Sequence, residues 1–237
     1  MTARLVDCRP REDYAAGHVP GAVQLDPESE LTAPAGDPAI GGRHPLPDPH
    51  ALAAVFARAG IGPGTFVLAY DDGTSGWAAR CWWLLRHLGH EDAGTFDLRA
   101  YDGPLSTEET RVERAPFVAR VRDDDIAEME ELRARLGDPS LVLVDARAPE
   151  RWRGDTEPLD PIAGRIPGAR NAYYLEPLPD DLADAPELVV YCGSGVSAAP
   201  VVQKLVLAGR ADVRLYPGSF SEWCRTPDNP IERGPAP

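Results

Sequence analysis

The chain has very little lysine and no surplus of positive charge. Lys204 is its single lysine, and 38 acidic residues against 24 basic ones leave a net charge of −14 over 237 residues. Nucleic-acid-binding proteins usually present a basic face, so we exclude that class of partner. Long apolar runs are absent as well: none approaches the roughly 18 residues of a membrane span, and we predict no membrane contact.

Cysteine is scarce and is not arranged for metal binding. The four cysteines are Cys8, Cys81, Cys192 and Cys224; they form no Cys-x-x-Cys pair, and no histidine lies at metal-ligand spacing. This excludes a zinc site and a disulfide scaffold, and we expect no metal and no other cofactor. Unpaired thiols, together with an N-terminus that resembles a strand rather than a leader, predict a cytoplasmic protein.

The two halves of the chain resemble each other. Three pairs of segments match in the same order: Leu5–Arg9 with Leu143–Arg147, Gly17–Ala22 with Gly164–Ala169, and Phe66–Asp71 with Glu187–Cys192. Each match is a short apolar strand or a tight turn. Two copies at a long period indicate a duplicated domain rather than a solenoid.

Short apolar runs alternate with helical stretches in both halves. The predicted strands are 4–7, 66–70, 93–97, 141–144, 188–191 and 212–215, and the predicted helices are 50–59, 76–88, 124–136 and 197–208. This alternation is typical of an α/β fold with a parallel sheet flanked by helices on both faces. We expect two such domains in tandem, residues 1–110 and 123–237, with a linker over 111–122. The acids Asp123 to Asp125 indicate a solvated cap of the following helix.

One loop carries the clearest chemical signal. Cys192-Gly193-Ser194-Gly195-Val196-Ser197 follows an apolar run and precedes a helical stretch. It therefore places a thiol between the carboxyl end of a buried strand and the amino end of a helix. Main-chain N–H groups and the helix dipole favour an anion there, and the thiolate is the reactive form of cysteine. We predict that Cys192 is a nucleophile.

The first half lacks this thiol. Asp71 holds the position there that Cys192 holds in the second half, and a carboxylate cannot act as a sulfur nucleophile. We predict an inactive first domain, a catalytic second domain and a site in the cleft between them. Cysteine-dependent phosphatases and arsenate reductases need an arginine six positions after the cysteine; Ala198 stands there instead, which argues against both classes.

Together these motifs resemble the tandem-domain rhodanese family, the thiosulfate and 3-mercaptopyruvate sulfurtransferases. The resemblance rests on Asp7-x-Arg9, Gly17–Ala22, Arg80–Trp83, Asp145-x-Arg147, Gly164–Ala169, the Cys192 loop and Tyr216–Trp223. It implies two rhodanese-like domains and a sulfurtransferase that needs no cofactor. Such an enzyme moves sulfur from a small anionic donor, through a persulfide on Cys192, to a thiol, cyanide or a thioredoxin-like protein.

Within that family the loop favours one donor. Cys-Gly-Ser-Gly-Val-Ser is similar to the Cys-Gly-Ser-Gly-Val-Thr loop of the mercaptopyruvate enzymes, whereas the thiosulfate enzymes carry charged residues in this loop. We therefore favour 3-mercaptopyruvate as the donor. Two alternatives stay open: a thiosulfate:cyanide sulfurtransferase, and a non-enzymatic persulfide carrier or binding module.

The resemblance also implies roles for single residues. Ser194, His44 and Asp26 match the groups that move protons in the mercaptopyruvate enzymes. Arg151 matches an arginine that binds the substrate carboxylate; the second such arginine has no clear match, and Arg165 is our candidate for it. The rest of the loop completes the predicted substrate site: Gly193, Gly195, Val196 and Ser197.

Overall fold

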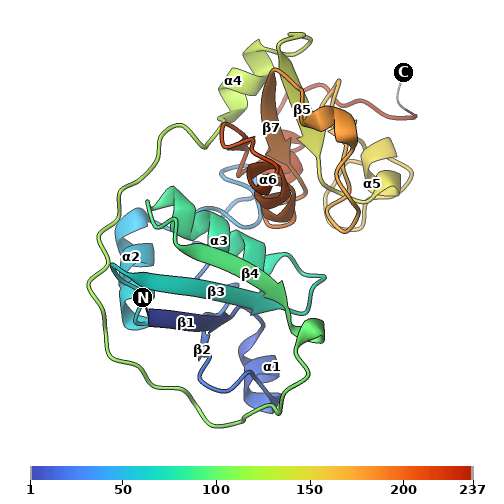
Figure 1. Ribbon diagram of the computed structural model, residues 1–237. Helices are drawn as coiled ribbons and strands as arrows, with labels where there is room; N and C mark the ends of the chain where they lie inside the picture. The colour runs from blue at the N-terminus through green and yellow to red at the C-terminus, as the bar shows by residue number, and fades with distance from the viewer. Residues whose placement is uncertain (1, 236–237) are drawn as a thin grey trace. The chain divides into compact units, whose positions relative to one another are not determined.

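The computed structural model describes residues 2–235, which fall into two compact units. The first unit holds the residues up to Pro34 and from Leu46 to Arg122, and the second holds Ala35–Pro45 and the residues from Asp123 onwards (Figure 1). This division differs from the domain limits expected from the sequence at residues 35–45 and 111–122. The short segment 35–45, which includes His44, groups with the unit that carries the cysteine loop.

The first unit is built on a parallel four-stranded sheet in the order β2-β1-β3-β4. Its elements are β1 (Thr2–Asp7), α1 (Arg11–Ala16), β2 (Val23–Gln24), α2 (Pro49–Arg58), β3 (Thr65–Asp71), α3 (Trp77–His87), β4 (Ala93–Asp97) and the 3-10 turn η1 (Leu98–Ala100). Helix α2 begins where it does because the Asp48 carboxylate accepts the N–H groups of His50 and Ala51, at 2.9 and 3.0 Å, as an N-cap does.

The second unit repeats this plan with a parallel sheet in the order β6-β5-β7-β8. Its elements are α4 (Met129–Ala134), β5 (Leu141–Asp145), α5 (Pro149–Arg153), β6 (Arg170–Asn171), the 3-10 turn η2 (Asp180–Leu182), β7 (Glu187–Tyr191), α6 (Ala198–Leu207), β8 (Arg214–Leu215) and α7 (Ser219–Trp223). The central strand β7 is almost wholly buried, and Tyr191 packs in one cluster with Phe220 and Trp223 of α7. Within the described residues, no helix combines the length and apolar character that crossing a bilayer demands.

The matched sequence motifs make the same contacts in both units, which confirms the predicted fold of two parallel α/β domains. In each unit an arginine binds an aspartate two residues earlier and a glycine carbonyl at 2.7 Å: Arg9 with Asp7 and Gly17, and Arg147 with Asp145 and Gly164. In each unit a tyrosine of a central strand accepts an N–H from an earlier turn of the chain: Tyr70 from Val19 at 3.0 Å, and Tyr191 from Ile166 at 3.1 Å. These contacts fix the turns that lead into β2 and β6.

The predicted helix 124–136 is wrong at its start. Helix α4 begins only at Met129, because the preceding backbone joins the sheet. Leu215 donates its N–H to the Asp125 carbonyl at 2.9 Å, and its own carbonyl accepts the N–H of Ala127 at 2.8 Å. Asp125 is only 3% exposed, so the prediction of a solvated cap at this residue is also wrong.

The segment predicted as the linker lies along the first unit. The N–H of Ala115 donates to the carbonyl of Ala57 at 2.9 Å, and the N–H of Arg122 donates to the carbonyl of His87 at 2.8 Å. The backbone of residues 111–122 is therefore hydrogen-bonded to the ends of α2 and α3, and it groups with the first unit.

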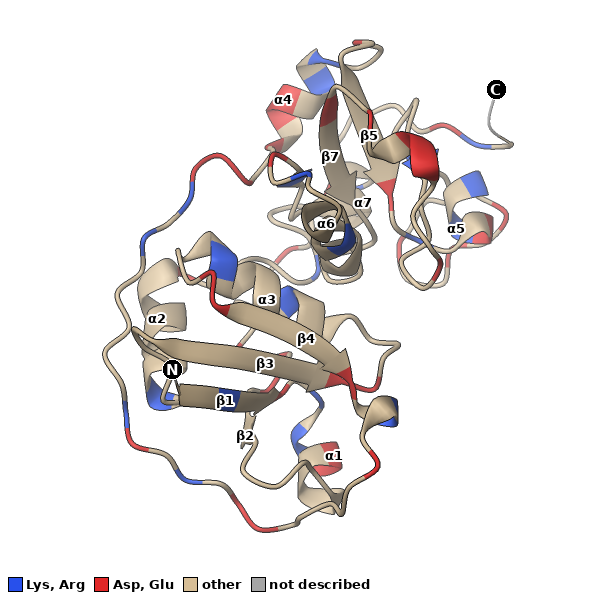
Figure 2. Ribbon diagram, viewed as in Figure 1, with Lys and Arg blue, Asp and Glu red and all other residues tan. Residues whose placement is uncertain are grey.

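Asp71 ends β3 and stands where the second unit has its cysteine. Its carboxylate accepts the N–H of Gly73 at 2.8 Å, the hydroxyl of Ser75 at 2.9 Å and the N–H of Ala78 at 2.9 Å. Asp71 is 5% exposed, and Figure 2 shows acidic residues at the carboxyl ends of β3 and β4. The donors of this loop are satisfied by the carboxylate of the chain itself.

We expect Asp71→Ala to lower the free energy of unfolding by about 2–4 kcal/mol, because it leaves three donors around a buried position without their acceptor. Asp72→Ala is the matched control: Asp72 also accepts three hydrogen bonds, from Thr74 and Ser75, but it is exposed. Water can replace that carboxylate, so the control should lose less than about 1 kcal/mol. Urea denaturation of both variants measures the difference; equal losses would contradict the account.

Candidate active site

Cys192 is the first residue after β7, and its loop of residues 192–197 leads into α6. The side chain is buried, with 1% exposed, and the main-chain N–H of Gly195 donates to the Sγ atom at 3.1 Å. Gly195 has a φ of +81°, a conformation that favours glycine. The loop therefore turns back over the sulfur and directs an amide at it, a contact that stabilises negative charge.

Residues of helix α7 form hydrogen bonds with the backbone of the cysteine loop. The N–H of Phe220 donates to the Cys192 carbonyl at 3.0 Å, and the N–H of Ser221 donates to the Gly193 carbonyl at 2.9 Å. The Ser219 hydroxyl accepts the N–H of Cys192 at 3.2 Å. Three consecutive residues of the chain thus fix the backbone of the first two loop residues.

His44 lies against the loop serine. The Nδ1 atom of His44 is 2.7 Å from the Oγ atom of Ser194, although the two residues are 150 positions apart in the sequence. Ser194 is buried. The structure thus brings together two residues that the sequence predicted for the site, in a hydrogen bond through which a proton can pass.

The segment that carries His44 is held by α7. Glu222 accepts the N–H of Gly41 at 2.7 Å through Oε1 and the hydroxyl of Tyr216 at 2.7 Å through Oε2. Ser221 accepts the N–H of Arg43 at 3.1 Å. Burial and the Glu222 carboxylate raise the pKa of Tyr216, so this phenol keeps its proton and stays a donor. Helix α7 therefore fixes both the cysteine loop and the histidine segment.

Gly42 fits closely against this support. Its φ is +80°, and a Cβ atom added there would lie 2.4 Å from the carbonyl oxygen of Gly218 and 2.8 Å from the Oγ atom of Ser221. The carbonyl is backbone and cannot swing away. Only glycine allows the chain to approach α7 this closely.

Arg151, the predicted carboxylate-binding residue, is anchored by acids. Its Nη2 atom donates to Glu157 at 2.6 Å, and Arg147 donates to the other oxygen of Glu157 at 3.1 Å. Arg147 is fully buried and also pairs with Asp145. Although burial opposes its charge, these carboxylates raise the pKa of Arg147. Arg151 keeps 18% of its side chain exposed, so it can still meet a ligand.

A second acid, Asp160, forms ion pairs with further arginines. It pairs with Arg43, which follows the glycine turn of the histidine segment, and with Arg225 at 2.6 Å; the Nη2 atom of Arg151 is 3.8 Å from it. The Asp160 side chain has no exposed surface. Ion pairs through buried acidic side chains thus link four arginines: Arg43, Arg147, Arg151 and Arg225.

Arg165 does not have the expected place. Its guanidinium is 1% exposed, pairs with Glu232, donates to the Gly234 carbonyl at 2.7 Å and lies over the Trp152 ring at 4.1 Å. It ties the C-terminal segment to the turn of residues 164–169 and presents no free face to a ligand. The prediction that Arg165 supplies the second substrate arginine is therefore not supported.

Other predicted site residues have varied surroundings. Asp26 belongs to the first unit, where its carboxylate accepts the N–H and the hydroxyl of Ser29, at 3.0 and 2.7 Å; its role as a partner of His44 stays a prediction. Val196 is buried in the loop. Ser197 stands at the N-cap of α6, but its side chain makes no capping hydrogen bond.

Sequence reasoning missed three residues that shape the site: Arg43, Asp160 and Glu222. Two signals were available: Arg43 directly precedes His44, and Glu222 lies inside the matched segment 216–223. Nothing in the sequence pairs Arg43 with Asp160, because 117 positions separate them.

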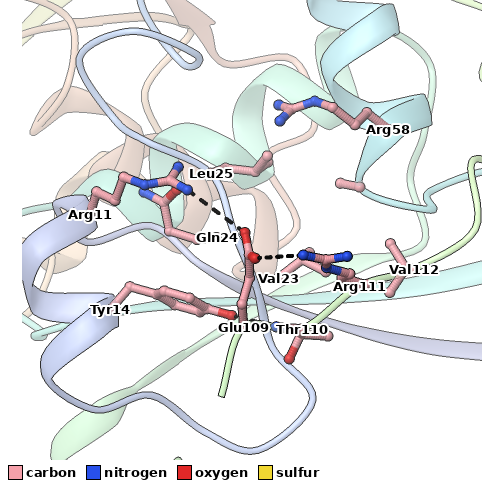
Figure 3. Close-up of a pocket in the computed structure, with 11 residues that line it drawn as sticks. Arg11, Tyr14, Val23, Gln24, Leu25, Arg58, Glu109, Thr110, Arg111 and Val112 are labelled. Atoms are coloured by element: carbon pink, nitrogen blue, oxygen red, sulfur yellow. Dashed lines mark hydrogen bonds and ion pairs between the residues drawn. The ribbon is translucent and has the colours of Figure 1, made fainter. Parts of the chain in front are cut away.

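A pocket of the first unit also carries charge but no nucleophile. It has a volume of about 340 Å³ and no cysteine or serine in its lining. Arg11 and Arg111 reach Glu109 from two sides, at 3.8 and 3.6 Å (Figure 3), and Arg58 pairs with Glu30. Its cations are exposed and already paired, so this pocket is no rival to the cysteine loop as a catalytic site.

The family of the chain follows from comparison with known proteins. The family model described as a rhodanese-like domain matches residues 1–103 and 128–226. The chain is 38% identical to a Pseudomonas aeruginosa protein named probable 3-mercaptopyruvate sulfurtransferase, over 93% of this chain and 86% of that protein. It is 32% identical to the human 3-mercaptopyruvate sulfurtransferase, over 90% of this chain and 79% of that one. A thiosulfate sulfurtransferase of Azotobacter vinelandii is 31% identical, over 96% and 90%.

Solved structures agree with this. A crystal structure titled as a probable thiosulfate sulfurtransferase matches with a TM-score of 0.66 and 31% identity, over 97% of both chains. An anaerobic ergothioneine biosynthesis enzyme from Chlorobium limicola matches with a TM-score of 0.84 but 21% identity, and this chain spans 65% of its length; that likeness concerns the fold alone. The chain belongs to the rhodanese-like family of sulfurtransferases.

We expect Gly42→Ala to displace the histidine segment, because the new methyl group would meet the Gly218 carbonyl. Sulfur transfer should fall at least about tenfold, with little loss of overall stability. Gly168→Ala is the control: Gly168 also has a positive φ, of +76°, but nothing lies within 4 Å of an added Cβ. Kinetic assays and thermal unfolding of both variants separate displacement from backbone strain; similar activity losses in the two would contradict the close approach at Gly42.

The cysteines should differ in their response to pH. Burial and the Asp160 carboxylate raise the pKa of Cys224 to about 11, and burial raises the pKa of Cys8. Both thiols therefore stay protonated and unreactive at neutral pH. We expect iodoacetamide at pH 7 to modify Cys192 but not Cys8 or Cys224, and Cys224 to react only as the pH approaches 11. Peptide mass mapping of the folded protein across this range is the test; rapid modification of Cys224 at pH 7 would overturn the assignment.

Proposed function

We propose that the protein takes a sulfur atom from 3-mercaptopyruvate onto Cys192 and passes it, from the resulting persulfide, to a thiol or cyanide in the cytoplasm. The hydrogen bond between His44 and Ser194 at 2.7 Å, beside a cysteine that accepts an N–H from its own loop, carries this proposal. The names of the Pseudomonas and human relatives support the choice of donor.

In the first step the Cys192 thiolate attacks the sulfur of the donor. A sulfur–sulfur bond forms, the bond between C3 and sulfur breaks, and its electron pair stays on C3 as the enolate of pyruvate. The proton of the donor thiol must move to C3 for pyruvate to leave. In the second step an acceptor thiolate attacks the outer sulfur, so that the acceptor leaves as a persulfide and Cys192 returns as a thiolate.

Ser194 and His44 are suited to that proton movement. The Ser194 hydroxyl lies two residues after the nucleophile, and an imidazole can exchange a proton near neutral pH. We assign to Ser194 the transfer of its hydroxyl proton to C3. We assign to His44 the transfer of a proton from the donor thiol back to Ser194. Asp26 is assigned the orientation of His44, as the family resemblance implies.

The loop amides and Arg151 supply the electrostatic part. The N–H of Gly195 already points at the Sγ atom, and amides of such a loop stabilise the negative charge of a persulfide. Arg151 is partly exposed and anchored by Glu157, so its remaining donors can bind the carboxylate of the donor with little loss of side-chain entropy.

The decisive experiment measures sulfur transfer from 3-mercaptopyruvate and from thiosulfate, with cyanide and with a small thiol as acceptors. We expect Cys192→Ser to abolish turnover, and the protein alone to gain the mass of one sulfur atom on Cys192 after exposure to the donor. His44→Asn should lower kcat by about 10²–10⁴-fold, as loss of a proton-transferring group does.

Two results would redirect the proposal. Turnover only of thiosulfate would make the protein a thiosulfate sulfurtransferase. A stable mass gain without turnover of either donor would make it a persulfide carrier. A mass gain that persists in Cys192→Ser would refute the assignment of the nucleophile.

A further inference from the structure

Two guanidinium groups meet at one point of the cysteine loop. Gly193 has no side chain, and a Cβ atom built there would lie 2.9 Å from the Nη2 atom of Arg43 and 3.4 and 3.6 Å from the Nη2 and Nη1 atoms of Arg151. Both cations therefore face the space beside Gly193, the residue next to the nucleophile. The missing side chain leaves that space to the arginines and to whatever they bind.

Arg43 is oriented before any ligand arrives. Its backbone N–H donates to the Ser221 hydroxyl at 3.1 Å, and its Nη1 atom pairs with Asp160. One side of the guanidinium is thus fixed, while Nη2 is the atom near the loop. Its side chain is 19% exposed, close to the 18% of Arg151, so both keep a face for a ligand.

Ion pairs with buried acids hold both guanidinium groups. The arginines are Arg43, Arg147, Arg151 and Arg225, and the acids linked to them by ion pairs are Asp145, Glu157 and Asp160. Because Arg43 and Arg151 keep part of their side chains exposed, each can still donate to a carboxylate of a ligand.

We propose that Arg43 is the second arginine of the carboxylate site, and that it acts with Arg151 to select a sulfur donor that bears a carboxylate. This rests on the proposed function for the identity of the donor. Each guanidinium donates to one or both oxygens of a carboxylate, and two arginines held at an angle fix its orientation. The carboxylate then determines where the donor sulfur lies relative to the Cys192 thiolate.

The assignment supplies the second carboxylate-binding arginine, which could not be identified from the sequence. Arg165, the sequence candidate, is committed to Glu232 and to backbone carbonyls. Arg43 reaches the loop from a distant part of the sequence, because α7 binds the segment that carries it. The residue before the catalytic histidine is thus a specificity-determining residue.

The test uses two alkylating reagents that differ in the carboxylate. 3-Bromopyruvate and bromoacetone are both bromomethyl ketones. In each case the Cys192 thiolate attacks the bromomethyl carbon, the sulfur–carbon bond forms and bromide leaves. Only 3-bromopyruvate has the carboxylate. The measured quantity is the ratio of their second-order rate constants for modification of Cys192, followed by peptide mass. It requires no sulfur transfer.

We expect the protein to prefer 3-bromopyruvate, and Arg43→Gln to lower the rate ratio on the order of tenfold, as loss of a charge-assisted contact does. Arg43→Lys should lower it less, because lysine keeps the charge near Asp160 but not the planar fork. Arg153→Gln is the control for net charge: Arg153 pairs with Asp155 on the surface, and its ratio should equal that of the unchanged protein.

An unchanged ratio in Arg43→Gln, with a fall in Arg151→Gln, would overturn the proposal, since Arg151 would then bind the carboxylate alone. No preference for 3-bromopyruvate in the unchanged protein would refute a carboxylate site altogether, even if sulfur is transferred. A preference that depends on Arg43, in a protein that transfers no sulfur from 3-mercaptopyruvate, would support this proposal while the proposed donor fails. In turnover, Arg43→Gln should raise KM for 3-mercaptopyruvate more than it lowers kcat.

Discussion

The contact of residues 41–44 with α7 is the constraint on which the site depends. Helix α7 is one of the shortest helices of the second unit, yet it binds the backbone of Cys192 and Gly193 on one side and the histidine segment on the other. Because the same residues hold both, the distance between Ser194 and His44 does not depend on long or flexible connections. Fixing two groups on one support is how a fold keeps reacting groups in place without a further loss of entropy.

Near the cysteine loop, acidic side chains hold arginines that can attract an anion, although the net charge of the whole chain is negative. A chain with a net charge of −14 would on average repel an anionic donor. Around the cysteine loop, however, Glu157 and Asp160 are buried and hold arginines in fixed positions. A guanidinium that is already anchored loses little freedom when it binds a carboxylate. The acids therefore position the cations that an anionic ligand needs.

The two units place different side chains at the same position of one fold. Both retain the same sheet order and the same aspartate–arginine–glycine contact, so the loop after the central strand is built alike in each. In the second unit the loop turns an amide towards a sulfur atom. In the first, the Asp71 carboxylate accepts three hydrogen bonds from its own loop. A loop lined with N–H donors favours an acceptor. In the first unit that acceptor is the Asp71 carboxylate, and in the second the Sγ atom of Cys192 takes its place.

The sequence by itself determined the class of fold and predicted Cys192 as the nucleophile. Apolar runs such as 188–191 and the repeat of Asp7-x-Arg9 in Asp145-x-Arg147 are local patterns, and strands or turns of a few residues are encoded locally. The sequence did not predict the start of α4, because the pairing of Asp125 and Ala127 with Leu215 is a contact between distant segments. The same holds for the site. Tertiary structure alone decided that Glu222 holds Gly41 across 181 positions of sequence, that Arg43 faces the cysteine loop and that Arg165 is buried elsewhere, since no spacing or periodicity records a contact made only after both segments have folded.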